Sequence, residues 1–355
     1  MYSMPQGIDA VDVDTERLRM HCLVTGPTDG TPVLLVHGNL STALFWDHLM
    51  AEADPGLRLI APDMRGFGAT QRAPIDATRG LRDWADDLHA LVRALDISQP
   101  VHLVGWSTGG GAILQYTIDR PAEVASLTLI DSVSPYGFGA TTGDDGTPTS
   151  DDYAGAGAGL VNPEFVQRLR AGDTTSESEV SPRNVLRAFY WHPQFRMDPA
   201  REDALVAEVL KSEISDDCYP GDGTPSDNWP GIAPGTRGIL NALSARWFNV
   251  SGIVDVTPKP PILWLRGDQD LIVGDQSMFD AGTLGKLGVL PDWPGDDIHP
   301  PQAMVAQTRA VLQRYTAAGG QVREEVLADS SHGPFIDHLE ESARVLYGFL
   351  ADVAR

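Results

Sequence analysis

The stretch Gly105-Trp106-Ser107-Thr108-Gly109-Gly110 decides the fold. It follows a short apolar run, Val101–Val104, and leads into a segment of helical pattern, Gly111–Ile118. A strand that turns at once into a helix crowds its backbone, and glycines two before and two after the serine relieve the crowding. The serine then occupies a strained turn with its hydroxyl exposed above the sheet edge. The N–H groups that open the helix favour negative charge at the same place.

Short apolar runs of the same kind recur along the chain and predict strands that are covered on both faces of a parallel sheet. They are Val33–Val36, Leu57–Ala61, Val101–Val104, Leu127–Ile130, Ile262–Leu265 and Val322–Leu327. Between several of them apolar residues recur at helical spacing, as in Leu81–Leu95 and Leu339–Val353. Alternating strands and helices predict a mostly parallel, doubly wound α/β sheet. Residues 8–25 can supply one or two antiparallel edge strands.

The alternation stops after Ile130 and resumes near Pro261. The interval holds a long stretch without helical or strand period, Gly139–Gly159, followed by helical patches. Long loops inside a compact protein are usually functional. We therefore expect residues 133–258 to form a large inserted cap over a core made of residues 1–132 and 259–355.

Composition limits the possible partners and the location of the protein. The 355 residues include 26 Lys and Arg and 49 Asp and Glu, which gives a net charge of −23. This charge disfavours binding to nucleic acid or to an anionic membrane. We see no signal peptide and no apolar run long enough to span a membrane. Two cysteines, Cys22 and Cys218, cannot form a disulfide framework, so we expect a cytoplasmic protein.

No metal or cofactor motif stands out in the sequence. The chain lacks H-E-x-x-H and a phosphate-binding loop, and its two cysteines are isolated. The acidic pairs Asp144-Asp145 and Asp151-Asp152 lack the spacing of a calcium loop. We expect chemistry that needs no cofactor.

Four pieces of the sequence together resemble the α/β-hydrolase superfamily. They are His37-Gly38-Asn39, the run Pro62–Gly68, the serine motif, and a late acid and histidine, Asp270 and His332. The resemblance covers the expected core and is closest to cap-bearing esterases, lactonases, epoxide hydrolases and dehalogenases. It implies an α/β-hydrolase fold with Ser107 as nucleophile. For Pro62–Gly68 we expect only a structural role, in which Asp63 and Arg65 organise a loop.

A serine hydroxyl needs a base within hydrogen-bonding reach and an acid that orients this base. In the superfamily the chain order is serine, acid, histidine. His332 follows the last predicted strand, where the superfamily carries its base. His299, in a Pro-rich acidic loop, and His338, at the start of the final helix, are better interpreted as structural.

Three aspartates are candidates for the acid. The family pattern places the acid three positions after a glycine and before apolar residues, which selects Asp270. Asp268 lies in the same loop. Asp131 ends the strand Leu127–Ile130, a position from which certain lactonases of the superfamily take their acid.

Acyl transfer also needs hydrogen-bond donors for the oxyanion. One is the backbone N–H of Thr108, and by resemblance the other is that of Asn39, with help from Leu40. Related dehalogenases and epoxide hydrolases carry aspartate as nucleophile, so Ser107 argues against both activities. Apolar and aromatic residues suggest a mostly apolar small-molecule substrate. The side chains expected to contact it are Leu40, Trp106, Tyr136, Phe138, Trp191 and Trp229.

The sequence thus predicts a serine hydrolase that cleaves a carboxylic ester or a lactone through an acyl-enzyme. Ser107, His332 and Asp270 are the expected triad. The same triad also suits a C–C hydrolase, a lyase or a perhydrolase, and some proteins with this fold are ligand receptors without catalysis.

Overall fold

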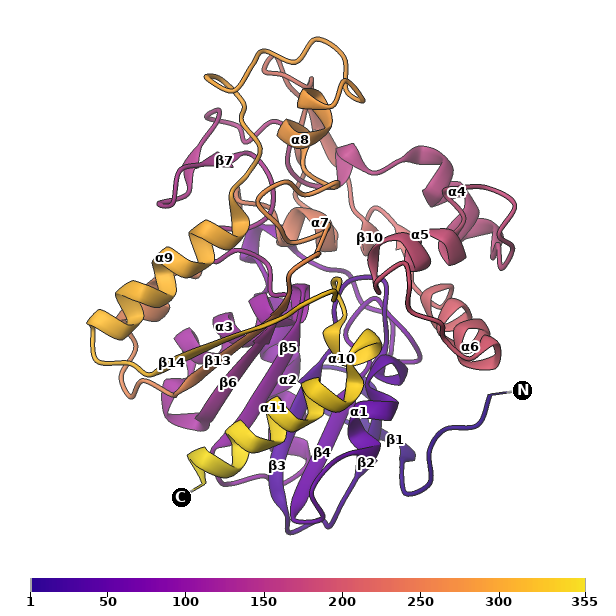
Figure 1. Ribbon diagram of the computed structural model, residues 1–355, viewed down its shortest axis with the longest axis vertical. Helices are drawn as coiled ribbons and strands as arrows, with labels where there is room; N and C mark the ends of the chain where they lie inside the picture. The colour runs from indigo at the N-terminus through magenta and orange to yellow at the C-terminus, as the bar shows by residue number, and fades with distance from the viewer. Residues whose placement is uncertain (1, 355) are drawn as a thin grey trace.

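An eight-stranded sheet forms the centre of the computed structural model, which describes residues 2–354 (Figure 1). The strand order is β1-β2-β4-β3-β5-β6-β13-β14. From β4 to β14 neighbouring strands are parallel, whereas β1 and β2 add an antiparallel edge. This confirms the mostly parallel α/β sheet. Its strands are β1 (Asp9–Asp14), β2 (Arg19–Thr25), β3 (Thr31–Val36), β4 (Leu57–Pro62), β5 (Val101–Trp106), β6 (Val124–Ile130), β13 (Ile262–Gly267) and β14 (Val322–Leu327).

Burial along the strands explains why the apolar runs were recognisable. All six residues of β5 are buried, as is nearly all of β3 and β6. Strand β14 is the exception, because it lies at the sheet edge and carries three consecutive charged residues, Arg323–Glu325. Val326 in β14 is 42% exposed. The middle of the sheet is therefore the most apolar part, and the serine motif follows its central strand β5.

Helices cover both faces of the sheet, as the doubly wound prediction requires (Figure 1). Helices α2, α3 and α9 lie on one face, and α1 and α11 lie on the other. Their bounds are α1 (Asp47–Ala51), α2 (Arg82–Ala94), α3 (Thr108–Asp119), α9 (Met304–Ala317), α10 (Pro334–Asp337) and α11 (Leu339–Val353). Short 3-10 helices are Ala43–Trp46, Ala77–Arg79, Pro121–Glu123, Ala158–Leu160 and Ser251–Asp255.

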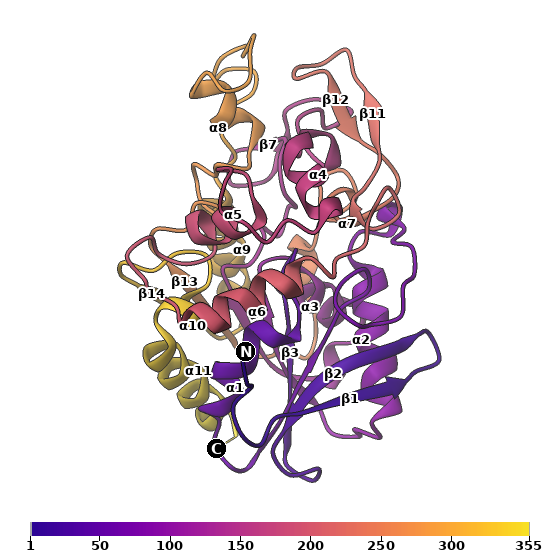
Figure 2. The same cartoon turned by 90° about the vertical axis from the view of Figure 1, so that its right-hand side faces the viewer.

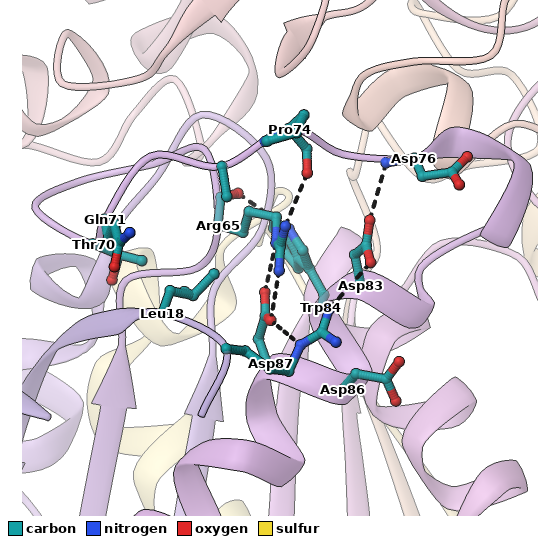
Figure 3. A network of polar contacts seen from close by, with 12 residues as sticks. Leu18, Arg65, Thr70, Gln71, Pro74, Asp76, Asp83, Trp84, Asp86 and Asp87 are labelled. Atoms are coloured by element: carbon teal, nitrogen blue, oxygen red, sulfur yellow. Dashed lines mark hydrogen bonds and ion pairs between the residues drawn. The ribbon is translucent and has the colours of Figure 1, made fainter. Parts of the chain in front are cut away.

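A buried ion-pair network fixes the loop that follows β4 (Figure 3). The Arg65 guanidinium donates two hydrogen bonds of 2.8 Å to the Asp87 carboxylate in α2, and a third of 2.9 Å to the Pro74 carbonyl. The Trp84 indole N–H donates to the Arg65 carbonyl at 3.2 Å. Both the guanidinium and the backbone carbonyl of Arg65 are therefore bonded to residues of α2, so Arg65 has the organising role in the loop that was expected for it.

Most of residues 133–258, which we call the insertion, lies above the carboxyl ends of the strands (Figure 1), whereas its last part, Ser251–Asp255, packs against α3 and α9 on one face of the sheet. Helix α6 crosses over the core in Figure 2. It is attached there by the buried ion pair of Arg201 with Asp47 of α1, at 2.9 Å. The elements of the insertion are β7 (Thr141–Thr142), β8 (Thr147–Pro148), α4 (Pro163–Ala171), α5 (Pro182–Phe189), α6 (Pro199–Val209), β9 (Ile214–Ser215), β10 (Tyr219–Pro220), β11 (Gly223–Pro225), β12 (Ile232–Pro234) and α7 (Ile239–Ala242).

A second excursion from the core, residues 268–303, packs against the insertion (Figure 1). It carries α8 (Ala281–Lys286). The Trp229 indole N–H donates to the Pro291 carbonyl at 2.8 Å, and the rings of Trp229 and His299 meet edge to face at 4.9 Å. Two segments separated by β13 therefore build the upper half of the molecule together.

The stretch Gly139–Gly159, which shows no sequence period, is packed and carries the hairpin β7–β8. Two fully buried glutamines hold its start. Gln302 accepts from the Gly139 N–H at 2.6 Å, and Gln307 donates to the Thr141 hydroxyl at 3.1 Å. Among residues 2–354, no helix has the length and apolar character needed to cross a membrane.

Candidate active site

Ser107 lies at the turn between β5 and α3, and its backbone is strained. Its φ and ψ are 56° and −120°, a region that residues with a side chain rarely adopt. Two glycines make the turn possible by close packing. A Cβ on Gly105 would lie 2.5 Å from the Gly109 carbonyl oxygen, and one on Gly109 would lie 2.2 Å from the Val36 carbonyl oxygen. The spacing of glycines around the serine therefore has the physical reason inferred from the sequence.

His332 and Asp270 form a buried hydrogen-bonded pair. His332 Nδ1 lies 2.9 Å from Asp270 Oδ2, and the two side chains are 2% and 3% exposed. The pair comes from the loops after β14 and β13, which are adjacent parallel strands whose carboxyl ends share one edge of the sheet. Asp270 Oδ1 accepts the N–H groups of Ile272 and Val273 at 2.7 and 3.0 Å. These donors hold the carboxylate with one oxygen directed at the imidazole.

Trp106 joins the serine turn to the histidine loop. Its indole N–H donates to the His332 carbonyl at 2.6 Å, and the two rings lie 5.4 Å apart between centroids. Because Trp106 precedes Ser107 in the chain, this contact places the imidazole of His332 beside the nucleophile's turn. Ser107, His332 and Asp270 thus follow the carboxyl ends of three parallel strands of one sheet, β5, β14 and β13.

The two rival aspartates have different surroundings. Asp268 is exposed, and its backbone N–H continues the pairing with β14 by donating to the Leu327 carbonyl at 3.0 Å. Asp131 is 2% exposed and accepts the Gly267 N–H at 3.1 Å. Its backbone N–H donates to the Leu265 carbonyl of β13 at 3.0 Å, which brings its side chain to the start of the loop that carries Asp270. Burial, and then the charge of Asp270, raises the pKa of Asp131 well above its usual value. Of the three candidates, Asp270 bonds to His332.

The expected oxyanion donors flank Ser107. Thr108 is the first residue of α3, so its N–H has no partner within the helix. On the other side, a Cβ on Gly38 would lie 2.9 Å from the Ser107 Cβ, which places the His37-Gly38-Asn39 loop against the serine. The Asn39 carbonyl accepts the Tyr190 hydroxyl at 2.8 Å. This bond directs the Asn39 carbonyl toward the insertion and fixes the loop.

His37 has a structural role in the same loop. Its Nε2 accepts the Met64 N–H at 2.8 Å, and its Nδ1 donates to the Gly38 carbonyl at 2.7 Å. Burial lowers the pKa of His37 to about 4, so the ring stays neutral. Asp63 accepts the N–H groups of Ala43 and Ala69, both at 2.8 Å. The loops after β3 and β4 therefore hold one another, in agreement with the structural role expected for Pro62–Gly68.

Asp337 holds the loop that carries His332, a role that no sequence pattern indicates. Its carboxylate accepts the Ser330 hydroxyl at 2.7 Å and the Ser331 N–H at 3.0 Å. It also accepts the N–H of His192, in the insertion, at 2.8 Å. Tyr190 is the other functional residue that sequence reasoning missed. Its ring lies 6.0 Å from that of His332, at the end of α5.

The six side chains expected to contact substrate lie in different places. Trp106 has no exposed surface and supports the histidine loop, so it is not accessible to a substrate. Leu40 is buried beside Asn39. Trp191 lines a cavity of about 420 Å³ within the insertion, together with Arg183, Phe195 and Met197. Of the other three, Tyr136 bonds to Arg314 and Trp229 to the Pro291 carbonyl through their side chains, and the backbone N–H of Phe138 donates to the Leu243 carbonyl.

Comparison with known proteins identifies the family. A family model described as the alpha/beta hydrolase fold matches residues 31–281. A non-heme chloroperoxidase of Streptomyces lividans is 37% identical over 125 residues, 35% of this chain and 44% of the relative. A 2-hydroxy-6-oxo-2,4-heptadienoate hydrolase of Pseudomonas putida is 39% identical over 107 residues, 29% of this chain and 38% of the relative. The matches thus span less than half the length of these relatives.

Among solved structures, the esterase RhEst1 from Rhodococcus aligns with 98% of this chain and 100% of its own, at a TM-score of 0.58. At 17% identity this likeness concerns the fold. The family match covers most of the chain and includes the serine turn and Asp270. The protein therefore belongs to the alpha/beta hydrolase family.

Proposed function

We propose that this protein is a serine hydrolase that cleaves carboxylic esters or lactones. The observation that carries the proposal is the buried 2.9 Å hydrogen bond between His332 and Asp270. The strained turn of Ser107 supports it, because the preceding residue, Trp106, bonds to the His332 carbonyl. A neutral imidazole whose Nδ1–H is held by a carboxylate presents its Nε2 as a base. The family membership and the fold shared with esterases add to this support.

In the proposed mechanism the Ser107 oxygen attacks the substrate carbonyl carbon while His332 Nε2 takes the hydroxyl proton. The backbone N–H groups of Thr108 and Asn39 stabilise the oxyanion. His332 then gives its proton to the leaving oxygen, and the acyl group remains on Ser107. Water, deprotonated by His332, attacks the acyl-enzyme and releases the acid. Asp270 holds the imidazole tautomer throughout and stabilises the imidazolium.

The surroundings of His332 support a mostly apolar acyl group. The rings of Tyr190 and Trp106 lie 6.0 and 5.4 Å from the imidazole between centroids. We propose that the insertion acts as a cap, because its residue Tyr190 bonds to the oxyanion loop and its residue His192 bonds to Asp337.

The proposal is tested with a fluorophosphonate probe and with p-nitrophenyl esters of increasing acyl length. We expect the wild type to be labelled and to turn over at least one ester, and Ser107→Ala to do neither. His332→Gln should lose activity by several orders of magnitude, whereas His338→Gln, outside the triad, is the matched histidine control. Labelling of Ser107→Ala, or ester turnover by it at near the wild-type rate, would refute the proposal.

A second candidate is C–C bond hydrolysis with the same residues, because one relative is named a 2-hydroxy-6-oxo-2,4-heptadienoate hydrolase. A vinylogous diketone substrate separates the two functions. Turnover of the diketone with kcat/KM well above that of every ester tested would favour the C–C hydrolase. The relative named a chloroperoxidase motivates a parallel assay for peracid formation from acetate and hydrogen peroxide.

A further inference from the structure

Two buried carboxyl groups meet behind the imidazole of His332. Asp270 accepts from the imidazole. Asp131, at the end of the neighbouring strand β6, donates its N–H to the Leu265 carbonyl at 3.0 Å and accepts the Gly267 N–H at 3.1 Å, so its carboxyl group lies at the end of β13 from which the Asp270 loop begins. Their side chains are almost completely shielded from solvent. Two carboxylates so close in an apolar setting repel one another unless one of them carries a proton. The pair therefore contains one carboxylate and one carboxylic acid.

The surrounding donors indicate which group holds the proton. Asp270 receives three N–H donors, from Ile272, Val273 and the imidazole of His332. Asp131 receives one, the Gly267 N–H, shared between its two oxygens at 3.1 and 3.4 Å. Donors stabilise the charged form of a carboxyl group, so the negative charge resides on Asp270. Burial, the charge of Asp270 and the more distant charge of Asp337 all raise the pKa of Asp131, in agreement with this assignment.

We propose that Asp131 is a positioning residue whose protonated carboxyl group donates a hydrogen bond to the Asp270 carboxylate. This bond, together with the two backbone N–H groups, fixes the oxygen that accepts from His332. The inference rests on the triad proposed above. No proton leaves Asp131 during turnover, because the Ser107 proton passes to His332 Nε2 and then to the leaving oxygen.

The protonation state of Asp131 determines the direction in which its removal changes the pH at which His332 is protonated. A hydrogen bond donated to Asp270 disperses part of its negative charge, so losing that donor makes His332 easier to protonate. The acid limb of kcat/KM then moves to higher pH. If Asp131 were charged instead, its removal would make His332 harder to protonate, and the limb would move to lower pH. A residue with a purely structural role would leave the limb in place.

The experiment compares Asp131→Asn with Asp131→Ala in the full chain, using kcat/KM for an activated ester across pH. The asparagine amide keeps a donor, so we expect the acid limb to stay at the wild-type pH and activity to fall less than about tenfold. The alanine variant should move the limb to higher pH. A shift to lower pH in either variant, no shift in Asp131→Ala, or a loss of about 10⁴-fold in Asp131→Asn would overturn the proposal.

Backbone geometry makes the asparagine variant a fair test. Asp131 has a φ of 38°, a region that asparagine tolerates as well as aspartate does. If Asp131→Ala fails to fold, Asp131→Gly removes the same donor without strain at this φ. Thermal unfolding of each variant checks the fold before kinetics are compared.

A measurement on the resting enzyme separates this proposal from the proposed function. The Nδ1 proton of His332, bonded to Asp270, gives a downfield proton resonance that needs no substrate. We expect the resonance to be little changed in Asp131→Asn, shifted in Asp131→Ala and lost in Asp270→Ala. An identical resonance in the wild type and Asp131→Ala would overturn the carboxyl pair even if Ser107 reacts with fluorophosphonate. Failure of that labelling would refute only the proposed function.

Discussion

The indole N–H of Trp106 donates a 2.6 Å hydrogen bond to the backbone carbonyl of His332. This bond connects the residue before the nucleophile with the base, although 226 positions separate them in the chain. Both partners are buried, so neither group has water as an alternative partner. The relative position of serine and histidine therefore depends on a side chain that we expected, from the sequence, to contact substrate.

Trp106→Phe should lower both stability and kcat. The variant keeps an aromatic ring but leaves the His332 carbonyl buried without a donor, which costs about 1–3 kcal/mol. The histidine loop then loses one of its fixed points, so kcat should fall with little change in KM. Unfolding in urea and ester kinetics measure the two effects.

Trp46→Phe is the matched control for this prediction. Trp46 is also fully buried, stacks on Phe335 at 4.2 Å between centroids, and has an indole N–H without a partner among the described residues. Trp46→Phe therefore removes the same atoms as Trp106→Phe but breaks no hydrogen bond. Equal loss of stability and activity in the two variants would show that the Trp106 bond has no special part in the site.

Tyr190→Phe should reduce kcat by about tenfold, less than the roughly 10²–10³-fold cost of removing an oxyanion donor outright. Its hydroxyl donates to the Asn39 carbonyl at 2.8 Å and so fixes the Asn39–Leu40 peptide, which directly follows the Asn39 N–H that we expect to stabilise the oxyanion. Steady-state kinetics on one ester give the comparison. Tyr219→Phe serves as control, because Tyr219 is also a buried tyrosine of the insertion and its hydroxyl makes no hydrogen bond among the described residues. A kcat for Tyr190→Phe equal to that of the control would contradict the prediction.

The serine turn and the main strands could be predicted from local sequence because their causes are local. A run of apolar residues predicts β5. The glycines that flank Ser107 are needed because a Cβ at either position would clash with nearby backbone atoms. The last strand, Val322–Leu327, has the bounds expected even though it lies at the exposed sheet edge. The glycine before it and the loop after it mark its ends.

The acid could not be chosen with the same certainty, because its choice depends on strand order. Asp131 and Asp270 follow β6 and β13, which are neighbours in the sheet but lie far apart in the chain. Both carboxyl groups therefore lie at the same edge of the sheet. Only the three-dimensional structure shows that Asp270 bonds to His332, whereas Asp131 accepts the Gly267 N–H. The contacts of Asp337 and Tyr190 cross between core and insertion in the same way and have no local pattern.

Replacing the nucleophile should reveal the strain at its turn. The φ of 56° and ψ of −120° at Ser107 cost about 1–3 kcal/mol for a residue with a Cβ and little for glycine. Glycine also stabilises the unfolded chain by about 0.5–1 kcal/mol. We expect Ser107→Gly to exceed Ser107→Ala in free energy of unfolding by about 1 kcal/mol, with both variants inactive. Chemical denaturation measures the difference, and a less stable glycine variant would argue against strain at this turn.

Buried histidines should make the protein less stable in mild acid. His299 is 3% exposed, its Nε2 has no partner among the described residues, and burial lowers its pKa to about 4. The unfolded chain binds the proton near pH 6.5, so the folded state binds fewer protons below that value. The stability is full above about pH 6.5 and is lost as the pH falls toward 4. His37 and His102 act in the same direction.

His299→Phe, which fills a similar space beside Trp229, should flatten this pH dependence by roughly 3 kcal/mol between pH 6.5 and 4. Urea unfolding at several pH values tests it. Asp280→Asn is the opposite control, because burial raises the pKa of Asp280 to about 6 and its protonation stabilises the folded state as the pH falls from 6 to 4. Removing it should steepen the loss of stability in acid. A pH dependence in His299→Phe as steep as that of the wild type would mean that His299 is protonated in the folded protein.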